Sequence, residues 1–376
     1  MNIAMITHWE FPPDVRIELE ASALIAEGHT VFVYANAERT RKKVDNYNGI
    51  GIRYFTPRTV LGTYVSTSPN LGSMLKDDRV DVIHLQDTPM MIPALLQAKR
   101  LGLPFIYDAH EIWPVLAWEN PAASLPRKIF LYAYYSLLEL VGSRLCQRLV
   151  SVVQEQADYF IGRYKVPPAK VAVVMNIADS RSLANIVAAR KFAPFQVCYV
   201  GGLERARNIE TVLETVALLK SIPDMKCVIV GEGSERRGLE EKAKELGISD
   251  KLVFTGYQPF NEAMSTVKSS DICLMPHVKS FRIDRTIPHK LSQYLFLGRP
   301  VISTPAAPIV RLLSDYVIIW NPTTPQKLAE IILTMYKNPE LTRSVSHLDS
   351  AISSRYDWSI EKRKLVELYQ SLETAR

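Results

Sequence analysis

The first half of the chain alternates short apolar runs with amphipathic stretches, from the first residues to about residue 180. The runs are apolar on both faces, which is typical of strands in a parallel sheet that helices cover on both sides. The runs that we expect to be strands are 2–7, 30–35, 82–85, 105–108 and 148–153. The stretches that we expect to be helices are 16–27, 89–100 and 126–147. The pattern therefore predicts a doubly wound α/β domain.

The same alternation restarts after a polar, alanine-rich connection at residues 177–194. Strands are expected at 196–200, 227–230, 252–255, 272–275 and 301–303, and helices at 208–222, 234–246 and 260–269. Thr324 followed by Pro325 predicts the start of a further helix, with a threonine cap and a proline in the first turn. We predict two Rossmann-like domains, residues 1–180 and 194–356, that face a cleft.

Composition is that of a globular protein, and 376 residues are enough for two domains of ordinary size. Four scattered cysteines show no metal-ligand spacing, so we expect buried free thiols in a reducing compartment; they are Cys146, Cys198, Cys227 and Cys273. The chain enters a predicted strand at once, and no apolar run approaches the roughly 20 residues of a membrane span. We therefore expect no signal peptide and a cytoplasmic protein. The net charge of +6 fits binding to phosphates or an anionic bilayer, but it is mild.

Glycine-rich loops follow two predicted strands of the second half. Gly201 and Gly202 follow the first strand, Gly231 and Gly233 follow the next, and a predicted helix opens after each loop. Glycines let the backbone approach a ligand, and a helix N-terminus favours a phosphate. The alternative is that these glycines only make tight turns. Neither loop is a dinucleotide fingerprint, because Arg236 stands where the third glycine belongs, and no Walker loop occurs.

Residues 286–304, TIPHKLSQYLFLGRPVIST, predict a turn, a short helix that ends at Gly298, and a strand. This segment resembles the one in which retaining glycosyltransferases of family 4 hold a nucleotide sugar. In that family the pattern is Pro-x-Lys-Leu-x-Glu-Tyr, followed by Gly-x-Pro-Val-Ile. Gln293 stands in place of the glutamate, and its amide oxygen can still accept a hydrogen bond from a ribose hydroxyl. The alternative for Gln293 is a solvated helix residue.

The resemblance extends to the glycine loops and implies a donor site. Arg207 stands where relatives carry a lysine that binds the diphosphate, whereas Gly202 replaces an arginine, so Lys290 is our candidate for the missing charge. The family's second glutamate is replaced by Arg285, and Asp284 is the nearest acid. The donor-binding residues expected from the resemblance are Gly201, Gly202, Arg207, Gly231, Gly233, Tyr257, Thr286, Ile287, Pro288, Lys290, Leu291 and Gln293.

A second motif lies in the first half of the chain. Asp108-Ala109-His110-Glu111 follows a predicted strand and resembles the Asp-Ala-His-Glu of many family members. The resemblance implies that His110 lies near the transferred sugar and the β-phosphate, where a histidine can stabilise developing charge. His110 and Glu111 are therefore our candidate catalytic residues. The alternative for the histidine is a capping or core role.

Two further segments bear on the acceptor. Asp14 and Arg16 replace a Gly-Gly pair of many relatives, and we expect them on the acceptor side. For Arg16 two roles stay open: it binds an anionic acceptor or phosphate, or it pairs with Asp14 or Glu20. Residues 125–135, LPRKIFLYAYY, mix basic and aromatic side chains on a predicted helix. This composition suits a bilayer surface or a lipid-linked acceptor; the alternative is a partly buried amphipathic helix.

The resemblance covers nearly the whole chain, including a Tyr-Asp-Trp-Ser motif before a last helix, 357–376, that would return to the first domain. It implies a retaining glycosyltransferase of GT-B fold that moves a sugar from a UDP- or GDP-sugar to a hydroxyl of a glycan, lipid-linked or small-molecule acceptor, as in the synthesis of cell-envelope polysaccharides. No Asp-x-Asp motif occurs and the resemblance implies a reaction without a bound metal, so we expect no metal. We also expect no cofactor and no nucleic-acid partner. We expect a protein of the cytoplasm or the inner membrane face. The alternatives are a nucleotide-sugar epimerase and a non-catalytic sugar-nucleotide-binding subunit.

Overall fold

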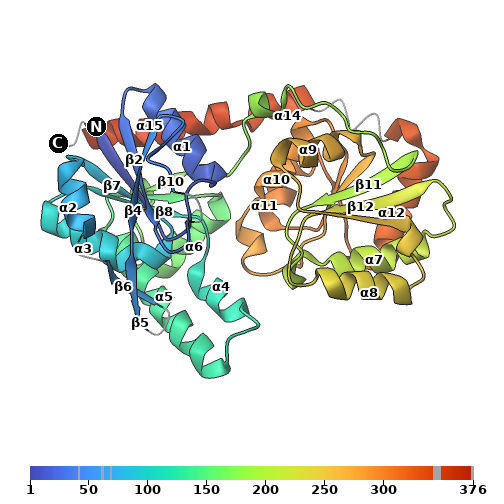
Figure 1. Ribbon diagram of the computed structural model, residues 1–376, viewed down its shortest axis with the longest axis horizontal. Helices are drawn as coiled ribbons and strands as arrows, with labels where there is room; N and C mark the ends of the chain where they lie inside the picture. The colour runs from blue at the N-terminus through green and yellow to red at the C-terminus, as the bar shows by residue number, and fades with distance from the viewer. Residues whose placement is uncertain (41–42, 61–62, 68–69, 342–348, 374–376) are drawn as a thin grey trace. The chain divides into compact units, whose positions relative to one another are not determined.

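The computed structural model describes residues 1–376 except 41–42, 61–62, 68–69, 342–348 and 374–376. The chain forms two compact units, one of Met1–Met175 with Glu361–Arg376 and one of Asn176–Ile360. In Figure 1 the first unit runs from blue to green and includes most of the red C-terminal helix, and the second unit runs from green through yellow and orange to red. Each unit is a mainly parallel sheet with helices packed on it, as the alternating pattern predicts.

The sheet of the first unit has the strand order β10-β9-β8-β7-β1-β2-β4-β3, and its pairs are parallel except for the edge pair β3–β4. The strands are β1 (Asn2–Thr7), β2 (Thr30–Asn36), β3 (Asn46–Tyr47), β4 (Ile50–Phe55), β7 (Val82–Gln86), β8 (Phe105–Ala109), β9 (Arg148–Ser151) and β10 (Val171–Val173). A separate antiparallel ribbon joins β5 (Pro57–Val60) to β6 (Thr63–Thr67). Strand order changes direction between β1 and β7, so their carboxyl ends form the crevice where ligands bind in such sheets.

Helices of the first unit begin and end at the expected signals. The helices are α1 (Val15–Ala26), α2 (Asn70–Asp77), η1 (Thr88–Met90), α3 (Met91–Leu101), α4 (Trp113–Glu119), α5 (Leu125–Leu145), α6 (Gln154–Tyr164), η2 (Pro168–Lys170) and most of α15 (Trp358–Glu373). The Asp14 carboxylate caps α1 by accepting from two backbone N–H groups, and Gly102 ends α3 in the left-handed conformation. The core lies between these helices and strand residues such as Ile83 and Tyr107, which are fully buried.

The sheet of the second unit is wholly parallel, in the order β13-β12-β11-β14-β15-β16. Its strands are β11 (Phe195–Val200), β12 (Met225–Val230), β13 (Leu252–Gly256), β14 (Ile272–Met275), β15 (Val301–Ser303) and β16 (Ile318–Ile319). Here the order changes direction between β11 and β14. The loops after these two strands therefore form the expected ligand crevice of this unit.

Helices of the second unit carry the predicted loops at their first turns. In the part of the chain that the structure describes, they are η3 (Ser180–Leu183), η4 (Arg205–Arg207), α7 (Ile209–Leu218), α8 (Arg236–Glu245), η5 (Ser249–Lys251), α9 (Phe260–Ser269), η6 (Ile283–Arg285), α10 (His289–Phe296), α11 (Ala307–Leu313), α12 (Pro325–Lys337) and α14 (Asp349–Arg355). Thr324 caps α12 through its hydroxyl, which accepts from the Lys327 N–H at 3.3 Å. This confirms the predicted helix start.

The structure also bears on the predictions for the cysteines, for membrane spans and for individual elements. All four cysteines are buried free thiols, as predicted. Within the described residues, no helix is long and apolar enough to cross a membrane. The predicted helix 208–222 is shorter than expected and ends at Leu218, and the strands β3 to β6 were not predicted. These strands are short and partly polar, so they lack the apolar run that identifies a central strand.

Candidate functional site

His110 lies at the carboxyl edge of the first sheet, directly after β8. Its Nε2 is 3.4 Å from Oδ2 of Asp108, and its side chain keeps 21% of its surface exposed while Asp108 has none. The two residues stand on the same strand end, where a backbone turn brings the histidine over the carboxylate. A partly open histidine held by a buried carboxylate suits a role at a ligand better than a core role.

Asp108 is held by a guanidinium from α1. Arg16 donates from Nη2 to both carboxylate oxygens of Asp108, at 3.1 and 3.0 Å, and the same nitrogen lies 3.0 Å from a carboxylate oxygen of Glu20. A further donation goes to the carbonyl of Val174 at 3.2 Å. Of the two roles left open for Arg16, the structure shows the pairing with Glu20. The guanidinium is 6% exposed and faces buried carboxylates, not solvent, while Asp14 is occupied as the cap of α1.

The same cluster contains a second histidine that sequence reasoning missed. His84, in the middle of β7, is fully buried, lies 3.5 Å from Asp108 through Nε2 and bonds the Tyr369 hydroxyl through Nδ1 at 2.8 Å. Gln86 on the same strand donates to Glu20 at 3.0 Å. The signal was present, because polar residues inside the apolar run of a central strand need buried partners.

Charge in this cluster sets the protonation of His110. Burial opposes its charge, but the neighbouring Asp108 outweighs burial and raises the pKa of His110 to about 9. Burial likewise opposes ionisation of Asp108, yet Arg16 and then His110 hold its pKa well below the usual range. Burial raises the pKa of Glu20 to about 7 against the pull of Arg16. At neutral pH His110 is therefore an imidazolium, a hydrogen-bond donor and not a base.

Asp87 and Glu111 border the same edge. Asp87 follows β7 with a φ of 74°, a conformation that non-glycine residues rarely adopt, and it is 5% exposed. Burial raises its pKa to about 6, and His110 is the largest opposing influence. Glu111 is partly buried at the turn before α4. Asp87 was not predicted, although an acid directly after a central strand was a usable signal.

In the second unit the glycine loops touch one another. Gly201 and Gly231 have φ values of 147° and 138°, and a side chain on Gly231 would collide with the carbonyl of Gly201. A side chain on Gly233 would collide with the backbone of Leu203, and one on Gly201 would lie 2.7 Å from the ammonium of Lys290. Tight turns alone would not require this closeness, so the loops form a packed cradle at the switch point.

Basic side chains line this cradle. Lys290, in the first turn of α10, donates to the Val200 carbonyl at 3.0 Å and lies 4.2 Å over the Tyr199 ring. Arg207 on η4 bonds Nε2 of His277 at 2.7 Å and pairs with Glu204 at 3.0 Å. His277 follows β14 and was also missed by sequence reasoning, although a histidine just after a central strand was visible. The structure thus brings both predicted cations to one switch point.

The electrostatics of this cluster differ from those around His110. Burial and then Arg207 lower the pKa of Lys290 well below its usual range. Burial, Lys290 and Arg207 lower the pKa of His277 to about 2, so this ring stays neutral and accepts a hydrogen bond from Arg207. Lys290 also stands at a helix N-terminus, where a cation is disfavoured. An anion placed here would relieve these costs, so the site suits a phosphate.

The remaining predicted donor residues lie on α10, in the segment 286–288 before it, and directly after β13. Gln293 is 8% exposed, so it is not a solvated helix residue. Ile287 and Leu291 are buried in the core and support the site by packing, whereas Thr286 and Pro288 are partly exposed and Tyr257 is 79% exposed. Arg285 stands in place of the family's second glutamate, and its guanidinium carbon lies 3.5 Å from the centre of the Phe281 ring. Asp284, the nearest acid, accepts from the backbone N–H of Ala307 at 3.1 Å.

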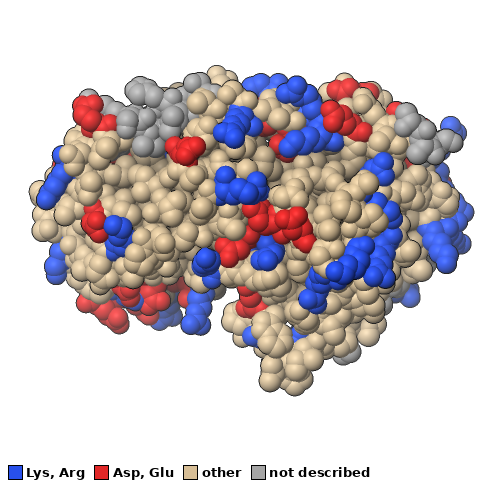
Figure 2. Space-filling view, turned by 180° about the vertical axis from the view of Figure 1, so that it is seen from behind, with Lys and Arg blue, Asp and Glu red and all other residues tan. Residues whose placement is uncertain are grey.

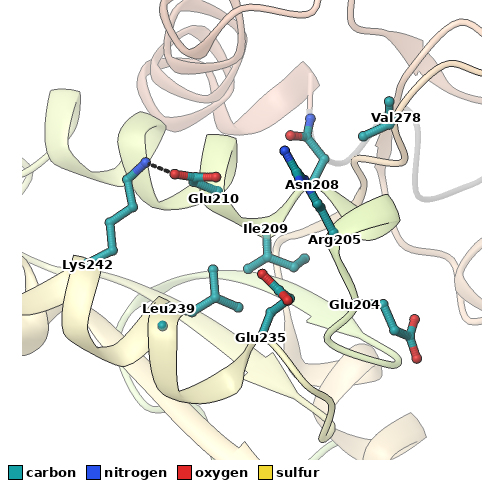
Figure 3. Close-up of a pocket in the computed structure, with 10 residues that line it drawn as sticks. Glu204, Arg205, Asn208, Ile209, Glu210, Glu235, Leu239, Lys242 and Val278 are labelled. Carbon is teal, nitrogen blue, oxygen red and sulfur yellow. Dashed lines mark hydrogen bonds and ion pairs between the residues drawn. The ribbon is translucent and has the colours of Figure 1, made fainter. Parts of the chain in front are cut away.

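A pocket of about 300 Å³ lies next to the cradle, between η4 and the first turns of α7 and α8. Figure 3 shows three carboxylates around it, from Glu204, Glu210 and Glu235, and Lys242 paired with Glu210. Arg205 also lines the pocket. Because acids outnumber the cations there, this pocket is less suited to a diphosphate than the cradle around Lys290.

Comparisons with known proteins identify the family. Residues 15–181 match the model of Glycosyltransferase Family 4, and residues 188–347 match the model of Glycosyl transferases group 1. An uncharacterized glycosyltransferase of Methanocaldococcus jannaschii is 22% identical, with 98% of each chain covered. Together the two models span most of the chain.

Solved structures show the same fold. Sucrose-phosphate synthase of Thermosynechococcus elongatus superposes with a TM-score of 0.76 at 15% identity and covers all of both chains. HepE of Anabaena, in complex with UDP and glucose, gives a TM-score of 0.76 at 14% identity over 99% of this chain and all of that one. The predicted GT-B fold is confirmed. The chain therefore belongs to the family-4 glycosyltransferases, the glycosyl transferases of group 1.

Proposed function

We propose that this glycosyltransferase takes a sugar from a nucleoside diphosphate sugar, UDP- or GDP-linked, and transfers it to a hydroxyl acceptor with retention of anomeric configuration. One observation carries the proposal: two cations, Lys290 and Arg207, converge on a glycine cradle at the switch point of the second sheet. The Anabaena relative of the same fold binds UDP and glucose, which supports this donor class.

The donor diphosphate is proposed to lie against the loop Gly201–Gly202, beside Arg207 and Lys290. Backbone N–H groups at the start of α7 favour an anion, but Glu210 in the first turn opposes one, so the two basic side chains are proposed to provide most of the binding. Arg207 offers a forked donor and Lys290 a point charge. The neutral ring of His277 accepts from Arg207, which holds the guanidinium in place. Gln293 is proposed to accept from the ribose hydroxyls through its amide oxygen.

His110 is proposed to act as a charged donor toward the sugar and the leaving diphosphate. Its imidazolium form, favoured by Asp108, stabilises the negative charge that develops as the bond from the anomeric carbon to the phosphate oxygen breaks. The acceptor oxygen forms the new bond to that carbon on the same face, and its proton passes to the departing diphosphate. The basic side chains and helix N-termini supply charge neutralisation, so we expect turnover in the presence of a chelator.

A thermal-shift series with UDP, GDP and ADP tests the donor. A nucleotide at 100 times its dissociation constant should stabilise the protein by about 2.7 kcal/mol. Arg207→Gln should abolish most of the shift, whereas Arg205→Gln, the matched control on the same short helix, should leave it unchanged because Arg205 makes no bond to His277. A donor shift that survives Arg207→Gln in full would remove the cradle from the site.

Product analysis separates this function from its alternatives. Transfer to an acceptor with the donor's anomeric configuration, read by NMR, is the expected result. Free UDP with an epimerised sugar and no need for an acceptor would indicate an epimerase. Tight nucleotide binding without turnover on any acceptor would indicate a non-catalytic subunit.

A further inference from the structure

The helix α5 is apolar on the face that it turns to solvent. Four of its large apolar side chains are 43 to 61% exposed, namely Leu125, Ile129, Phe130 and Leu137, and Leu145 at its end is 62% exposed. At 100° per residue, Ile129, Phe130 and Leu137 fall on one side of the helix. This side, with the neighbouring exposed Leu96 of α3, is named the α3–α5 face.

The opposite side of α5 is apolar too. Leu131, Tyr135 and Leu138 are buried against the rest of the first unit. The alternative of a partly buried amphipathic helix describes α5 in part, because one side is buried and exposed Arg127 and Arg144 lie on the other. The large apolar side chains that share this exposed side are unusual for a helix that faces only water.

A groove continues the α3–α5 face between the two helices. Its volume is about 700 Å³, and apolar side chains from both helices line it, among them Ile92, Leu95, Leu96, Val141 and Leu145. The groove and the exposed leucines make one apolar surface of about the length of α5, which at 1.5 Å per residue is roughly 30 Å. A monomer in water rarely leaves such a surface open.

The exposed charges that α3 and α5 themselves carry have one sign, whereas Glu119 at the end of the neighbouring α4 is an exposed acid. The charged residues of α3 and α5 that reach solvent are all basic, namely Lys99, Arg100, Arg127, Lys128 and Arg144. The one acid on these helices, Glu139, is fully buried and accepts from Trp113, Tyr159 and Tyr164. In Figure 2 the projecting α4–α5 tip of the first unit is mainly uncharged, and a band of Lys and Arg crosses the neighbouring surface.

An apolar centre with a basic rim is the pattern that an anionic bilayer binds. Apolar side chains enter the boundary between headgroups and acyl chains, and each Lys or Arg gains from the surface potential. A second protein copy would cover the apolar side chains equally well, but two identical basic rims would repel each other. The charge pattern therefore favours lipid over a second copy.

We propose that the α3–α5 face docks the protein on an anionic membrane surface and that the acceptor is accordingly lipid-linked. Within the first unit, α4 begins three residues after His110 and packs against α5, so α4 connects the α3–α5 face to the edge that carries His110. A bilayer on the α3–α5 face would bring a lipid headgroup to that edge. The acceptor class rests on the proposed function, whereas the docking surface does not.

Vesicle sedimentation of the full chain, without any substrate, tests the surface. Vesicles of phosphatidylcholine are compared with vesicles in which one third is phosphatidylglycerol. The unchanged protein should sediment with the anionic vesicles, and the bound fraction should fall as the salt concentration is raised. The double variant Ile129→Gln/Leu137→Gln should partition about tenfold less, since two aliphatic anchors are lost. Arg127→Gln/Arg144→Gln should bind the anionic vesicles less and lose most of the salt dependence.

A matched control and a second measurement keep the test decisive. Leu218→Gln, at a 51% exposed leucine of α7 in the other unit, should bind as the unchanged protein does. Circular dichroism and melting temperature verify that each variant is folded. No binding to anionic vesicles, or equal binding by Ile129→Gln/Leu137→Gln, overturns the proposal. A dimer in light scattering that the same double variant converts to monomer also overturns it and assigns the face to a second copy.

Discussion

The two clusters of ionisable groups at the sheet edges differ in how their charges are balanced. Around Asp108, Arg16 and His110 meet two carboxylates, and every charge has an opposite within the fold. Around Lys290, two cations lie beside a neutral histidine, and the nearest acid, Glu204, is 55% exposed. The first cluster is complete without a ligand, whereas the second is complete only when an anion arrives. One cluster therefore contributes to folding and the other to binding.

The largest expected effect comes from opening the balanced cluster. Arg16→Met should destabilise the protein by about 3–5 kcal/mol, because it leaves two buried carboxylates without their partner. Urea unfolding measures the loss. As a control, Arg181→Met removes an arginine that is 70% exposed and pairs with Asp179, and it should cost less than about 0.5 kcal/mol. Equal stability of the two variants would show that the cluster is not balanced as described.

Removing a cation from the unbalanced cluster should have the opposite effect on stability. Lys290→Met relieves a buried charge whose pKa is lowered by burial, so the free protein should melt at the same or a higher temperature. Nucleotide affinity should fall by about 1.5–3 kcal/mol, the range for a charged hydrogen bond, as measured by calorimetry. Lys327→Met on α12 serves as control. A clear loss of stability in the free protein would mean that Lys290 is a structural residue.

The pH dependence of turnover should change when Asp108 loses its charge. The pKa of His110 is raised to about 9, so its charged form is present below that pH and is lost as pH rises through 9. In Asp108→Asn the burial that lowers the pKa remains while the opposing carboxylate is gone, so the alkaline limb should move to lower pH. Activity at about pH 8 should fall tenfold or more relative to the optimum.

A second variant serves as the control for the pH dependence of turnover in Asp108→Asn. His110→Gln should lose the limb altogether, with kcat lowered much more than donor affinity. An alkaline limb that stays in place in Asp108→Asn would show that another group sets it.

The smallest effect is expected at Gln293. Replacing it with alanine should weaken donor binding by about 1 kcal/mol, since the ribose hydroxyls lose a neutral acceptor. Gln293→Glu should bind the donor as tightly or more tightly, because a charged acceptor makes a stronger hydrogen bond. Calorimetry with UDP and GDP decides the matter. Silence in both variants would remove Gln293 from the donor site and favour a non-catalytic subunit.

Sequence patterns predicted the sheets because strands buried on both faces leave long apolar runs. They also predicted the cradle, since its glycines directly follow two strands and the segment 286–293 is a contiguous motif. Strands β3 to β6 escaped because polar residues or glycine interrupt their apolar positions, as Gly51 and Arg53 do in β4. Local sequence pattern thus predicts a strand or a loop where a few adjacent residues determine its structure.

Long-range pairing set the limit of prediction. Arg16 and Asp108 are 92 residues apart, and Arg207 and His277 are 70 apart, so neither pair is marked by any spacing. The acceptor-side role expected for Arg16 stays a prediction, but its guanidinium already has three buried partners. His84 and His277 show that a polar residue within or just after a central strand is the signal to search for.

The contact between Tyr369 and His84 has a consequence for folding during synthesis. Tyr369 is fully buried and bonds a histidine 285 residues earlier, and Leu365 of the same helix is buried as well. The ribosome makes this helix only after the whole of the second unit. The second unit can therefore close its core first, while the first unit, although made earlier, waits for its last helix to supply the partner of His84 Nδ1.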